Sequence, residues 1–307
     1  MAVLRYGRWI SSEVSGDIDV IRAAVERRLD EICANYLSRV PPRLAEAVRY
    51  GLKSPGKRVR PLLLAIAYDA AGGKGDASLL ACAPEIIHSY SLVHDDLPCM
   101  DDDDLRRGRP TVHKVYGSRT AISAGVVMIP LAVRVVVAGA NALGLQAETN
   151  RRILRALLEG AGATGMIGGQ LRDLAGEGVA LSLTERESVH SAKTGGLIVA
   201  ALRMGALAAQ ANESVLEAFN RYGQAIGLAF QIMDDVLDVT STSGALGKTA
   251  GRDVALGKST YPALLGIDGA RGRARMLIEE GLAALEHESL LTQELTQVAN
   301  FMVTRTS

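Results

Sequence analysis

The sequence predicts an all-α fold in which ten or more helices form a single domain over residues 1–307. Apolar residues recur at spacings of three and four along most of the chain, as in amphipathic helices. Hydrophobic residues make up 48% of the composition, enough for a substantial core. No convincing run of alternating polar and apolar residues indicates a strand, and no shift in composition marks a domain boundary.

The first predicted helix has an apolar stripe that begins at Ile18 and continues to Ile32. Ser12 before Glu13 indicates a helix start, and Thr184 before Glu185 and Glu187 indicates another of the capping-box kind. Short segments rich in Gly or small polar residues separate later helices, at 72–75, 141–146, 176–178 and 241–251. The same periodicity predicts helices over 41–52, 59–72, 78–97, 148–164, 184–210, 213–240, 270–287 and 290–304.

The stretch from Ala121 to Leu145 is almost wholly apolar and therefore needs a membrane test. Pro130 and Arg134 interrupt it, so that it falls short of a clean apolar span of about 20 residues. An unpaired Arg at mid-membrane depth is costly. We expect a buried helix of a soluble bundle, without stable membrane insertion, although the run of β-branched residues from 126 to 137 also has some strand character.

The charge balance and the cysteines narrow the class of protein. A formal net charge of zero argues against a nucleic-acid partner. Cys33, Cys82 and Cys99 are far apart and lack CxxC spacing, so neither a disulfide framework nor a cysteine zinc site is expected. The first 16 residues do not have the pattern of a signal peptide. Together these features predict a cytoplasmic protein.

Two acidic clusters each follow an apolar helical stretch. The first holds six aspartates in ten residues from Asp95, and Pro98 within it should distort or end the helix so that Asp95 and Asp101 can point the same way. The second runs from Asp234 to Asp238, whose spacing of four places both on one helix face. A solvated acidic surface is the alternative for either cluster alone. As a pair they favour Mg²⁺, which binds through carboxylates and substrate phosphates.

Several basic groups complement the acidic clusters, as a diphosphate ligand would require. Arginine suits bidentate phosphate contacts and lysine acts as a point charge. Each group alone is also compatible with a solvated surface. His88, two turns before Asp95 on the same face, is either a core residue or a phosphate donor. The basic groups are Lys57-Arg58-Val59-Arg60, Arg106-Arg107-Gly108-Arg109, Lys193-Thr194-Gly195-Gly196, and Lys248 with Lys258.

In this combination and order the motifs resemble the trans-prenyl diphosphate synthases, or polyprenyl synthetases, and are most similar to bacterial farnesyl and geranylgeranyl diphosphate synthases. The resemblance covers most of the chain. It rests on GKRVRP (56–61), EIIHSYSLVHDDLPCMDDDDLRRGRPTVHKVYG (85–117), GGQLRDLAG (168–176), KTGGL (193–197), GLAFQIMDDVLDV (227–239) and LGKTAGRDVALGKSTYPALLG (246–266).

The resemblance implies the isoprenoid synthase fold, with helices around a central apolar cavity, and a homodimer. It implies a prenyltransferase that condenses isopentenyl diphosphate with dimethylallyl or geranyl diphosphate and uses three Mg²⁺ ions. The implied catalytic set is Lys193 with the metal ligands Asp95, Asp96, Asp101, Asp234, Asp235 and Asp238. The allylic diphosphate would contact Arg106, Lys193, Thr194, Gln231, Lys248 and Lys258, and isopentenyl diphosphate would contact Lys57, Arg60, His88 and Arg107.

Product length is expected to depend on Tyr90 and Ser91, which precede Asp95 by about one turn. A bulky residue near this position limits elongation in short-chain members of the family. The resemblance therefore favours the fifteen-carbon product, farnesyl diphosphate, with the twenty-carbon geranylgeranyl diphosphate as the alternative. Tyr90 could equally be a core residue.

One position departs from the family pattern, because Val126 stands where most relatives carry Asp. Two other functions are alternatives. A class I terpene cyclase often lines its cavity with aromatic rings, whereas aromatic residues are 4% here. A non-catalytic subunit of a heteromeric synthase would be expected to lack one aspartate motif, and both are present.

Overall fold

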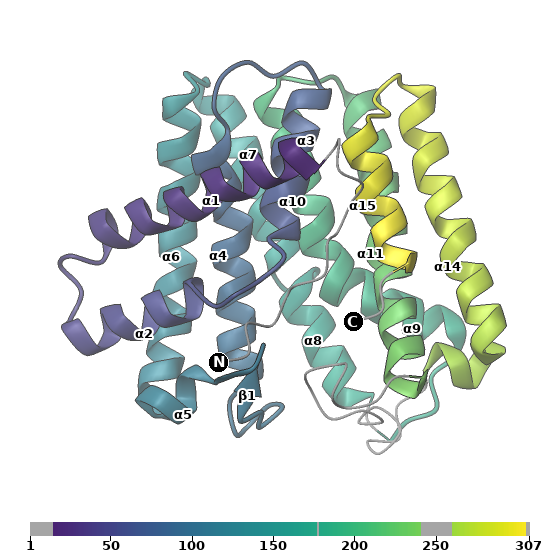
Figure 1. Cartoon of the computed structure of the whole chain (residues 1–307), viewed down its shortest axis with the longest axis horizontal. Coiled ribbons are helices and arrows are strands. Elements are labelled where there is room, and N and C mark those ends of the chain that lie inside the picture. The colour runs from purple at the N-terminus through teal and green to yellow at the C-terminus, as the bar shows by residue number, and fades with distance from the viewer. Residues whose placement is uncertain (1–14, 177, 241–259, 305–307) are drawn as a thin grey trace.

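A computed structural model of the chain describes residues 15–176, 178–240 and 260–304 (Figure 1). Most of these residues are helical, so the prediction of an all-α fold with ten or more helices is confirmed. The helices are α1 (Ser15–Tyr36), α2 (Pro42–Leu52), α3 (Val59–Ala70), α4 (Ser78–Asp95), α5 (Val112–Tyr116), α6 (Ser118–Ala142), α7 (Ala147–Ala161), α8 (Met166–Ala175), α9 (Leu183–His190), the π-helix η1 (Ser191–Gly195), α10 (Gly196–Ala208), α11 (Glu213–Thr240), α14 (Tyr261–His287) and α15 (Gln293–Thr304).

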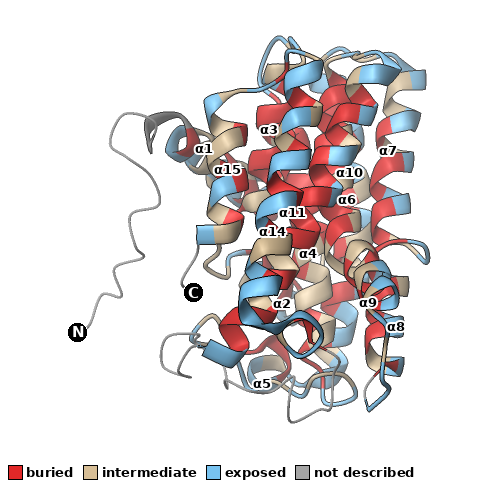
Figure 2. Cartoon of the chain, turned by 90° about the vertical axis from the view of Figure 1, so that its right-hand side faces the viewer, coloured by how far each residue is buried: buried red, intermediate tan, exposed pale blue. Residues whose placement is uncertain are grey.

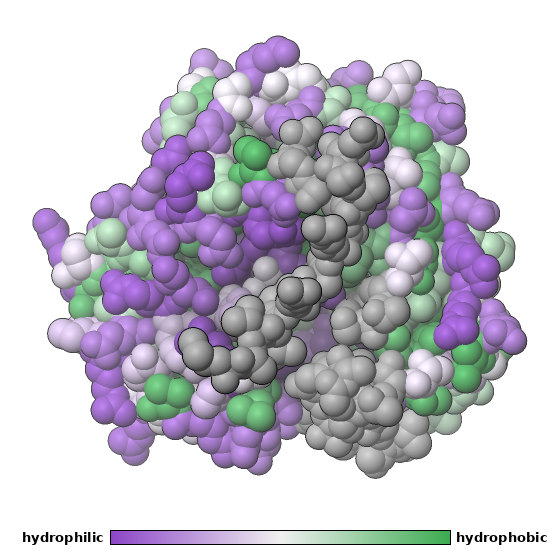
Figure 3. All heavy atoms as spheres, in the orientation of Figure 1, coloured by the Kyte–Doolittle hydropathy of each residue, from purple (hydrophilic) through white to green (hydrophobic). Residues whose placement is uncertain are grey.

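The buried core runs along the long helices at the centre of the bundle. α4 packs against α6, α10 packs against α3, α7 and α11, and α11 packs against α14. Figure 2 shows the buried residues concentrated on these helices. α1 and α2 cross the bundle on one side (Figure 1), and hydrophilic residues predominate over them on the face shown in Figure 3. Both acidic clusters lie at the ends of central helices, because α4 ends at Asp95 and α11 ends just after Asp238.

The start of α9 differs from the prediction. Ser182, rather than Thr184, is the N-cap: its hydroxyl accepts a hydrogen bond from the Glu185 backbone N–H at 3.3 Å. The Glu185 carboxylate in turn accepts the Ser182 backbone N–H at 2.8 Å. A capping box needs Glu three residues after the cap. Glu185 has that spacing from Ser182, and Glu187 has it from Thr184, so the sequence offers two capping boxes. The helix uses the first, and Thr184 lies in its first turn.

α6 contains the apolar stretch that required a membrane test. Among the described helices it alone is long and apolar enough to span a membrane by length and composition, and 44% of its most apolar window is buried. It packs against α4, α2, α5 and α7. The β-branched run is helical, as predicted. Its outward face carries an apolar row that we call the α6 stripe, formed by Ile122, Val126, Pro130, Val133 and Val137.

A short β-hairpin was not predicted. Strands β1 (Leu105–Arg106) and β2 (Arg109–Pro110) pair antiparallel after the first acidic cluster. The two residues between them, Arg107 and Gly108, both have positive φ, as a type I′ turn requires. The Thr111 N–H donates to the Asp104 carbonyl at 3.0 Å and closes the base. We call residues 104–111 the arginine hairpin.

Candidate active site

The first acidic cluster folds back on the end of its helix. α4 ends at Asp95, three residues before Pro98. The Asp101 backbone N–H then donates to the Asp95 carbonyl at 2.8 Å, which places the two aspartates side by side although six residues separate them along the chain. The backbone therefore brings Asp95 and Asp101 together, as expected from the position of Pro98.

Asp95 lies in an environment that disfavours its negative charge. Burial raises the pKa of its carboxyl to about 6, and the neighbouring charges of Asp101 and Asp96 act in the same direction. The positive charges of Lys193 and Arg106 oppose this rise. Because burial is the main cause of the raised pKa, a cation bound beside Asp95 would stabilise its charged form.

Asp96 is buried and paired with the arginine hairpin. Arg106 Nε donates to Asp96 Oδ1 at 2.8 Å, and Arg106 NH2 contacts both Asp96 and Asp103, the latter at 2.9 Å. Burial raises the pKa of the Asp96 carboxyl, whereas Arg106 lowers it. A small cavity of about 30 Å³ adjoins this pair. Arg106 thus lies beside the first cluster, with its guanidinium held by two aspartates.

The second acidic cluster lies near the end of α11. Asp235 and Asp238 are buried and Asp234 is partly exposed. Asp235 Oδ2 accepts the Tyr261 backbone N–H at 3.1 Å, at the first residue of α14, and lies 3.8 Å from Arg186 NH2. The structure therefore joins Asp235 to two other elements, α9 and α14.

Lys193 and Thr194 lie on the π-helix η1, where the predicted long helix departs from α geometry. Lys193 Nζ lies 2.7 Å from Asp173 Oδ2 on α8. The Thr194 hydroxyl donates to Gln231 Oε1 on α11 at 2.9 Å. The structure thus brings together two residues predicted for the allylic diphosphate, Thr194 and Gln231, and places Lys193 within electrostatic range of Asp95.

Arg186 was missed in the sequence. It is buried on α9, and its NH1 lies 3.1 Å from Asp173 Oδ1, opposite Lys193. Asp173 consequently lies between the two cations. Arg186 stands between Glu185 and Glu187 in the sequence, so nothing local distinguishes it from a solvent-exposed charge.

The basic residues predicted for isopentenyl diphosphate gather beside the arginine hairpin. Arg107 NH1 donates to the Pro55 carbonyl at 2.7 Å, and a Cβ at Gly56 would collide with the Arg107 guanidinium. This contact joins the GKR loop to the hairpin and explains why Gly precedes Lys57. Lys57 Nζ lies 4.8 Å from the ring centre of Phe301 on α15.

The charges of this group act on one another. Burial lowers the pKa of Arg60 to about 10, with Glu85 raising it and Arg107 lowering it further. Burial also holds the pKa of His88 well below its usual range, and the positive charges of Arg60, Arg107 and Arg106 add to that effect. His88, Arg60 and Arg107 therefore form a cationic group with a neutral imidazole.

Arg58, in the middle of the GKR motif, is a structural residue. It is almost fully buried, and its guanidinium lies 2.7 Å from Glu85 on α4 and 2.7 Å from Glu26 on α1. It also donates to the Leu52 carbonyl at 3.1 Å. Because Arg58 fixes this loop to α1 and α4, its neighbours Lys57 and Arg60 are held in place.

The residues predicted to set product length lie on α4. The Tyr90 ring is partly buried, 4.9 Å from the His94 ring centre in an edge-to-face contact. The Ser91 hydroxyl donates to the His88 carbonyl at 2.9 Å and is turned back on its own helix. Val126 is 53% exposed on α6, whereas its neighbour Gly125 leaves room for His94.

Two residues predicted to contact the allylic diphosphate, Lys248 and Lys258, lie outside the described part of the chain.

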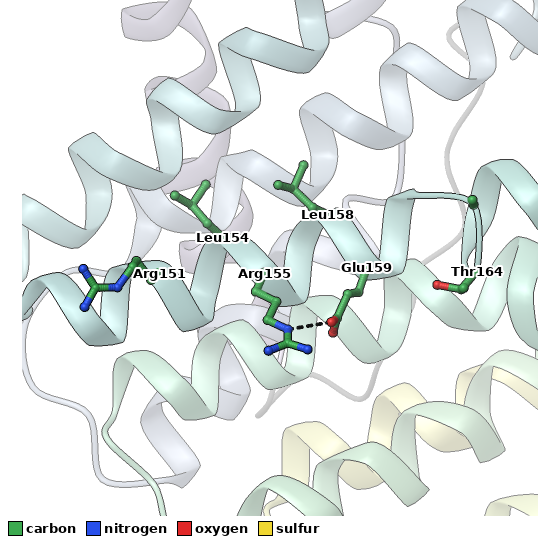
Figure 4. Close-up of a pocket in the computed structure, with 7 residues that line it drawn as sticks. Arg151, Leu154, Arg155, Leu158, Glu159 and Thr164 are labelled. Carbon is green, nitrogen blue, oxygen red and sulfur yellow. Dashed lines mark hydrogen bonds and ion pairs between the residues drawn. The ribbon is translucent and has the colours of Figure 1, made fainter.

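An open pocket of about 510 Å³ lies along α7, as Figure 4 shows. It is lined by Leu154, Leu158 and the Arg155–Glu159 ion pair of 2.7 Å. No residue predicted for the active site lines it.

Carboxylate oxygens and Arg and Lys side chains are the groups that bind metal ions and diphosphates, and this fold brings both kinds together. The polyprenyl synthetase family model matches residues 41–298. The chain is 41% identical to the dimethylallyltranstransferase of Fischerella ambigua, over 93% of this chain and 82% of that protein. It is 38% identical to the farnesyl diphosphate synthase of Haemophilus influenzae, with 95% and 99% covered.

Two further proteins extend the comparison. The mitochondrial geranylgeranyl pyrophosphate synthase 6 of Arabidopsis thaliana is 39% identical, with 97% of this chain and 94% of that protein covered. The crystal structure of a geranyltransferase from Helicobacter pylori, complexed with magnesium and isoprenyl diphosphate, has a TM-score of 0.79 at 31% identity, with 96% and 98% covered. The chain belongs to the polyprenyl synthetase family, and it is a prenyltransferase. The family resemblance, the fold and the enzyme class predicted from the sequence are thereby confirmed.

Proposed function

We propose that this prenyltransferase condenses isopentenyl diphosphate with dimethylallyl or geranyl diphosphate to form farnesyl diphosphate. The observation that carries the proposal is the position of Asp95, which has Asp101 folded against it and the charge of Lys193 within range. On the same side of the bundle, Arg107 joins the GKR loop to the arginine hairpin. One acidic site and a separate basic group suit two diphosphates bound at once.

Six aspartates are proposed to hold Mg²⁺: Asp95, Asp96, Asp101, Asp234, Asp235 and Asp238. The donor set fits the ion, because all are hard oxygen ligands, and burial, which raises the pKa of Asp95, leaves a carboxylate that a bound cation would stabilise. We infer three ions. When bound, Mg²⁺ supplies Lewis-acid stabilisation of a departing diphosphate.

The side chains of this chain have separate tasks in the proposed reaction. Lys193, Thr194, Gln231 and Arg106, with Lys248 and Lys258, hold the allylic diphosphate as its C–O bond breaks, and the cations stabilise the charge that develops. Lys57, Arg60, His88 and Arg107 orient isopentenyl diphosphate so that its double bond attacks the allylic cation. The released diphosphate takes the final proton. Apolar helices exclude water that would otherwise quench the cation.

The decisive experiment incubates the purified chain with isopentenyl diphosphate, each allylic starter and Mg²⁺, followed by chromatography of the dephosphorylated products. We expect a fifteen-carbon alcohol, no product without Mg²⁺, and a loss of several hundredfold or more in rate for Asp95→Asn. Glu279→Gln, at a residue of α14 outside the proposed site, should keep the wild-type rate. A mainly twenty-carbon product would favour geranylgeranyl diphosphate instead. Cyclic products without isopentenyl diphosphate would indicate a terpene cyclase, and no turnover would indicate a non-catalytic subunit.

We also propose a homodimer in which the α6 stripe is the shared interface. Ile122 and Val126 are exposed at successive turns of one helix, and Val137 continues the same row. A contiguous exposed apolar face of this kind marks an interaction surface. A second copy is the occupant favoured, because a two-fold interface pairs one surface with itself.

We further propose a cytoplasmic location, and one domain over residues 1–307. The single domain is supported by one core cluster that extends from Ile18 to Met302 among the described residues.

A further inference from the structure

We propose a second metal site in this chain, formed by Asp102, Asp104 and His113 and suited to a divalent transition-metal ion such as Zn²⁺. One ring nitrogen of His113 and one carboxylate oxygen of each aspartate lie within 4.8 Å of one another. None of the three is among the six aspartates proposed above for Mg²⁺. The site stands on its own geometry and does not depend on the proposed reaction.

His113 is the residue that points to a bound ion. Its side chain is buried, with 6% of the residue exposed, and its Nε2 atom has no hydrogen-bond partner. Nδ1 lies 3.0 Å from the Thr111 hydroxyl. Leaving a buried nitrogen without a hydrogen-bond partner is unfavourable. An ion at Nε2 would satisfy that nitrogen, and the Thr111 contact would orient the ring, as the partners behind metal-binding histidines do.

The two aspartates supply the compensating charge. Both are exposed, so their side chains can rotate toward an ion with little rearrangement. The ligand atoms of a tetrahedral zinc ion lie roughly 3.3 Å apart, given bond lengths of about 2.0–2.2 Å. Asp104 Oδ1 lies 2.6 Å from Lys114 Nζ, which leaves Oδ2 for the ion.

The ligand types select the kind of ion. Imidazole favours zinc and its first-row neighbours, whereas Mg²⁺ prefers an all-oxygen octahedral shell. Three protein ligands of the His and Asp type leave a fourth position for water. Two carboxylates also neutralise the charge of a divalent ion. We therefore expect Zn²⁺ to bind here in the presence of excess Mg²⁺.

The location gives the site a structural role. Asp104 precedes β1 and His113 follows β2, so an ion between them joins the two ends of the arginine hairpin. In the protein alone, the hydrogen bond from Thr111 to the Asp104 carbonyl closes this base. The bound ion would add a second closure and would restrict the hairpin that carries Arg106 and Arg107.

The test uses the full chain, freed of metal with EDTA and titrated with Zn²⁺ in excess Mg²⁺ by calorimetry. The wild type should bind one Zn²⁺ more per chain than either His113→Gln or Asp102→Asn. His287→Gln removes an exposed histidine at the end of α14 and controls for adventitious surface binding, so it should keep the wild-type stoichiometry.

Two further measurements keep the test independent of folding. Asp102→Asn alters only an exposed side chain, so a tenfold or greater loss of affinity there cannot be ascribed to a damaged core. Co²⁺ should give a visible absorption band in the wild type that both variants lack. If either His113→Gln or Asp102→Asn binds Zn²⁺ with the wild-type stoichiometry and affinity, the proposal is wrong.

Discussion

Lys193 Nζ and Asp173 Oδ2 are 2.7 Å apart, and the second oxygen of the same carboxylate lies 3.1 Å from Arg186 NH1. Asp173 thus shares its charge between a partly exposed lysine and a buried arginine. Removing one member of a buried pair leaves the other uncompensated, which is costly. The Asp173 carboxylate therefore helps to hold Lys193 in place near Asp95, without itself being a residue proposed to bind substrate.

Asp173→Asn should lower the free energy of unfolding by about 3 kcal/mol, because the buried Arg186 loses its closer negative partner and is left with Asp235 at 3.8 Å. Urea denaturation of the metal-free protein measures this change. Glu187, on the same helix as Arg186, forms a partly exposed ion pair with Arg273 of α14. Glu187→Gln breaks that pair, is the matched control and should cost about 1 kcal/mol or less. Equal losses of unfolding free energy in the two variants would show that the buried pair stabilises the fold no more than the exposed pair does.

Variants at Arg58 and Lys57 should distinguish the role of the GKR motif in stability from its role in substrate binding. Arg58→Met leaves Glu85 buried and unpaired and should cost about 3–5 kcal/mol in unfolding free energy. The double variant Arg58→Met/Glu85→Met should recover most of that loss, since a buried pair replaced by apolar residues is often neutral. Lys57→Met should change stability by about 1 kcal/mol at most, while weakening isopentenyl diphosphate binding. A double variant no more stable than the single one would contradict this account.

The depressed pKa of His88 should appear in the pH dependence of stability. Below pH of about 6.5 the unfolded chain binds a proton at this ring, whereas the folded chain does not until lower pH. His88 therefore makes the wild type lose stability as the pH falls, by up to about 1.4 kcal/mol per pH unit. His88→Gln and His88→Asn should both lose less stability than the wild type between pH 7 and pH 5 in urea denaturation. Parallel losses in all three proteins would exclude the effect.

Tyr90→Ala should shift products toward longer chains, because the ring fills space one turn before Asp95. Tyr90→Phe keeps the ring and should keep the product length, which also tests whether the hydroxyl matters. Product chromatography gives the distribution directly. An unchanged distribution in Tyr90→Ala would assign Tyr90 to packing against His94 instead.

The α6 stripe should control the association state. Ile122→Glu/Val137→Glu places two charges on the stripe and should convert the dimer to a monomer at micromolar concentration, as measured by sedimentation velocity. Val20→Glu, at an exposed apolar residue of α1, should leave the dimer intact. A dimer that survives both changes would place the interface elsewhere.

The sequence predicted the helices and both acidic clusters because their signals are local. Apolar periodicity and Pro98 act within a few residues of the features that they determine. Arg58 was grouped with the basic residues expected to bind diphosphate because its partner Glu85 is 27 residues away, and periodicity does not reveal such pairs. Arg186 was missed for the same reason. The arginine hairpin has strands of two residues, which are too short to produce an alternating pattern.

The π-helix between α9 and α10 makes the length of this segment critical. A π turn holds one residue more than an α turn, so η1 behaves as a single-residue insertion in an otherwise continuous helix. Each residue of an α-helix turns the chain by roughly 100°. Deleting one residue from 191–195 would restore regular geometry and rotate α9 relative to α10, which would carry Arg186 away from Asp173. The number of residues in η1 thus determines whether Arg186 reaches Asp173. A deletion that removes no charged residue would therefore break this ion pair.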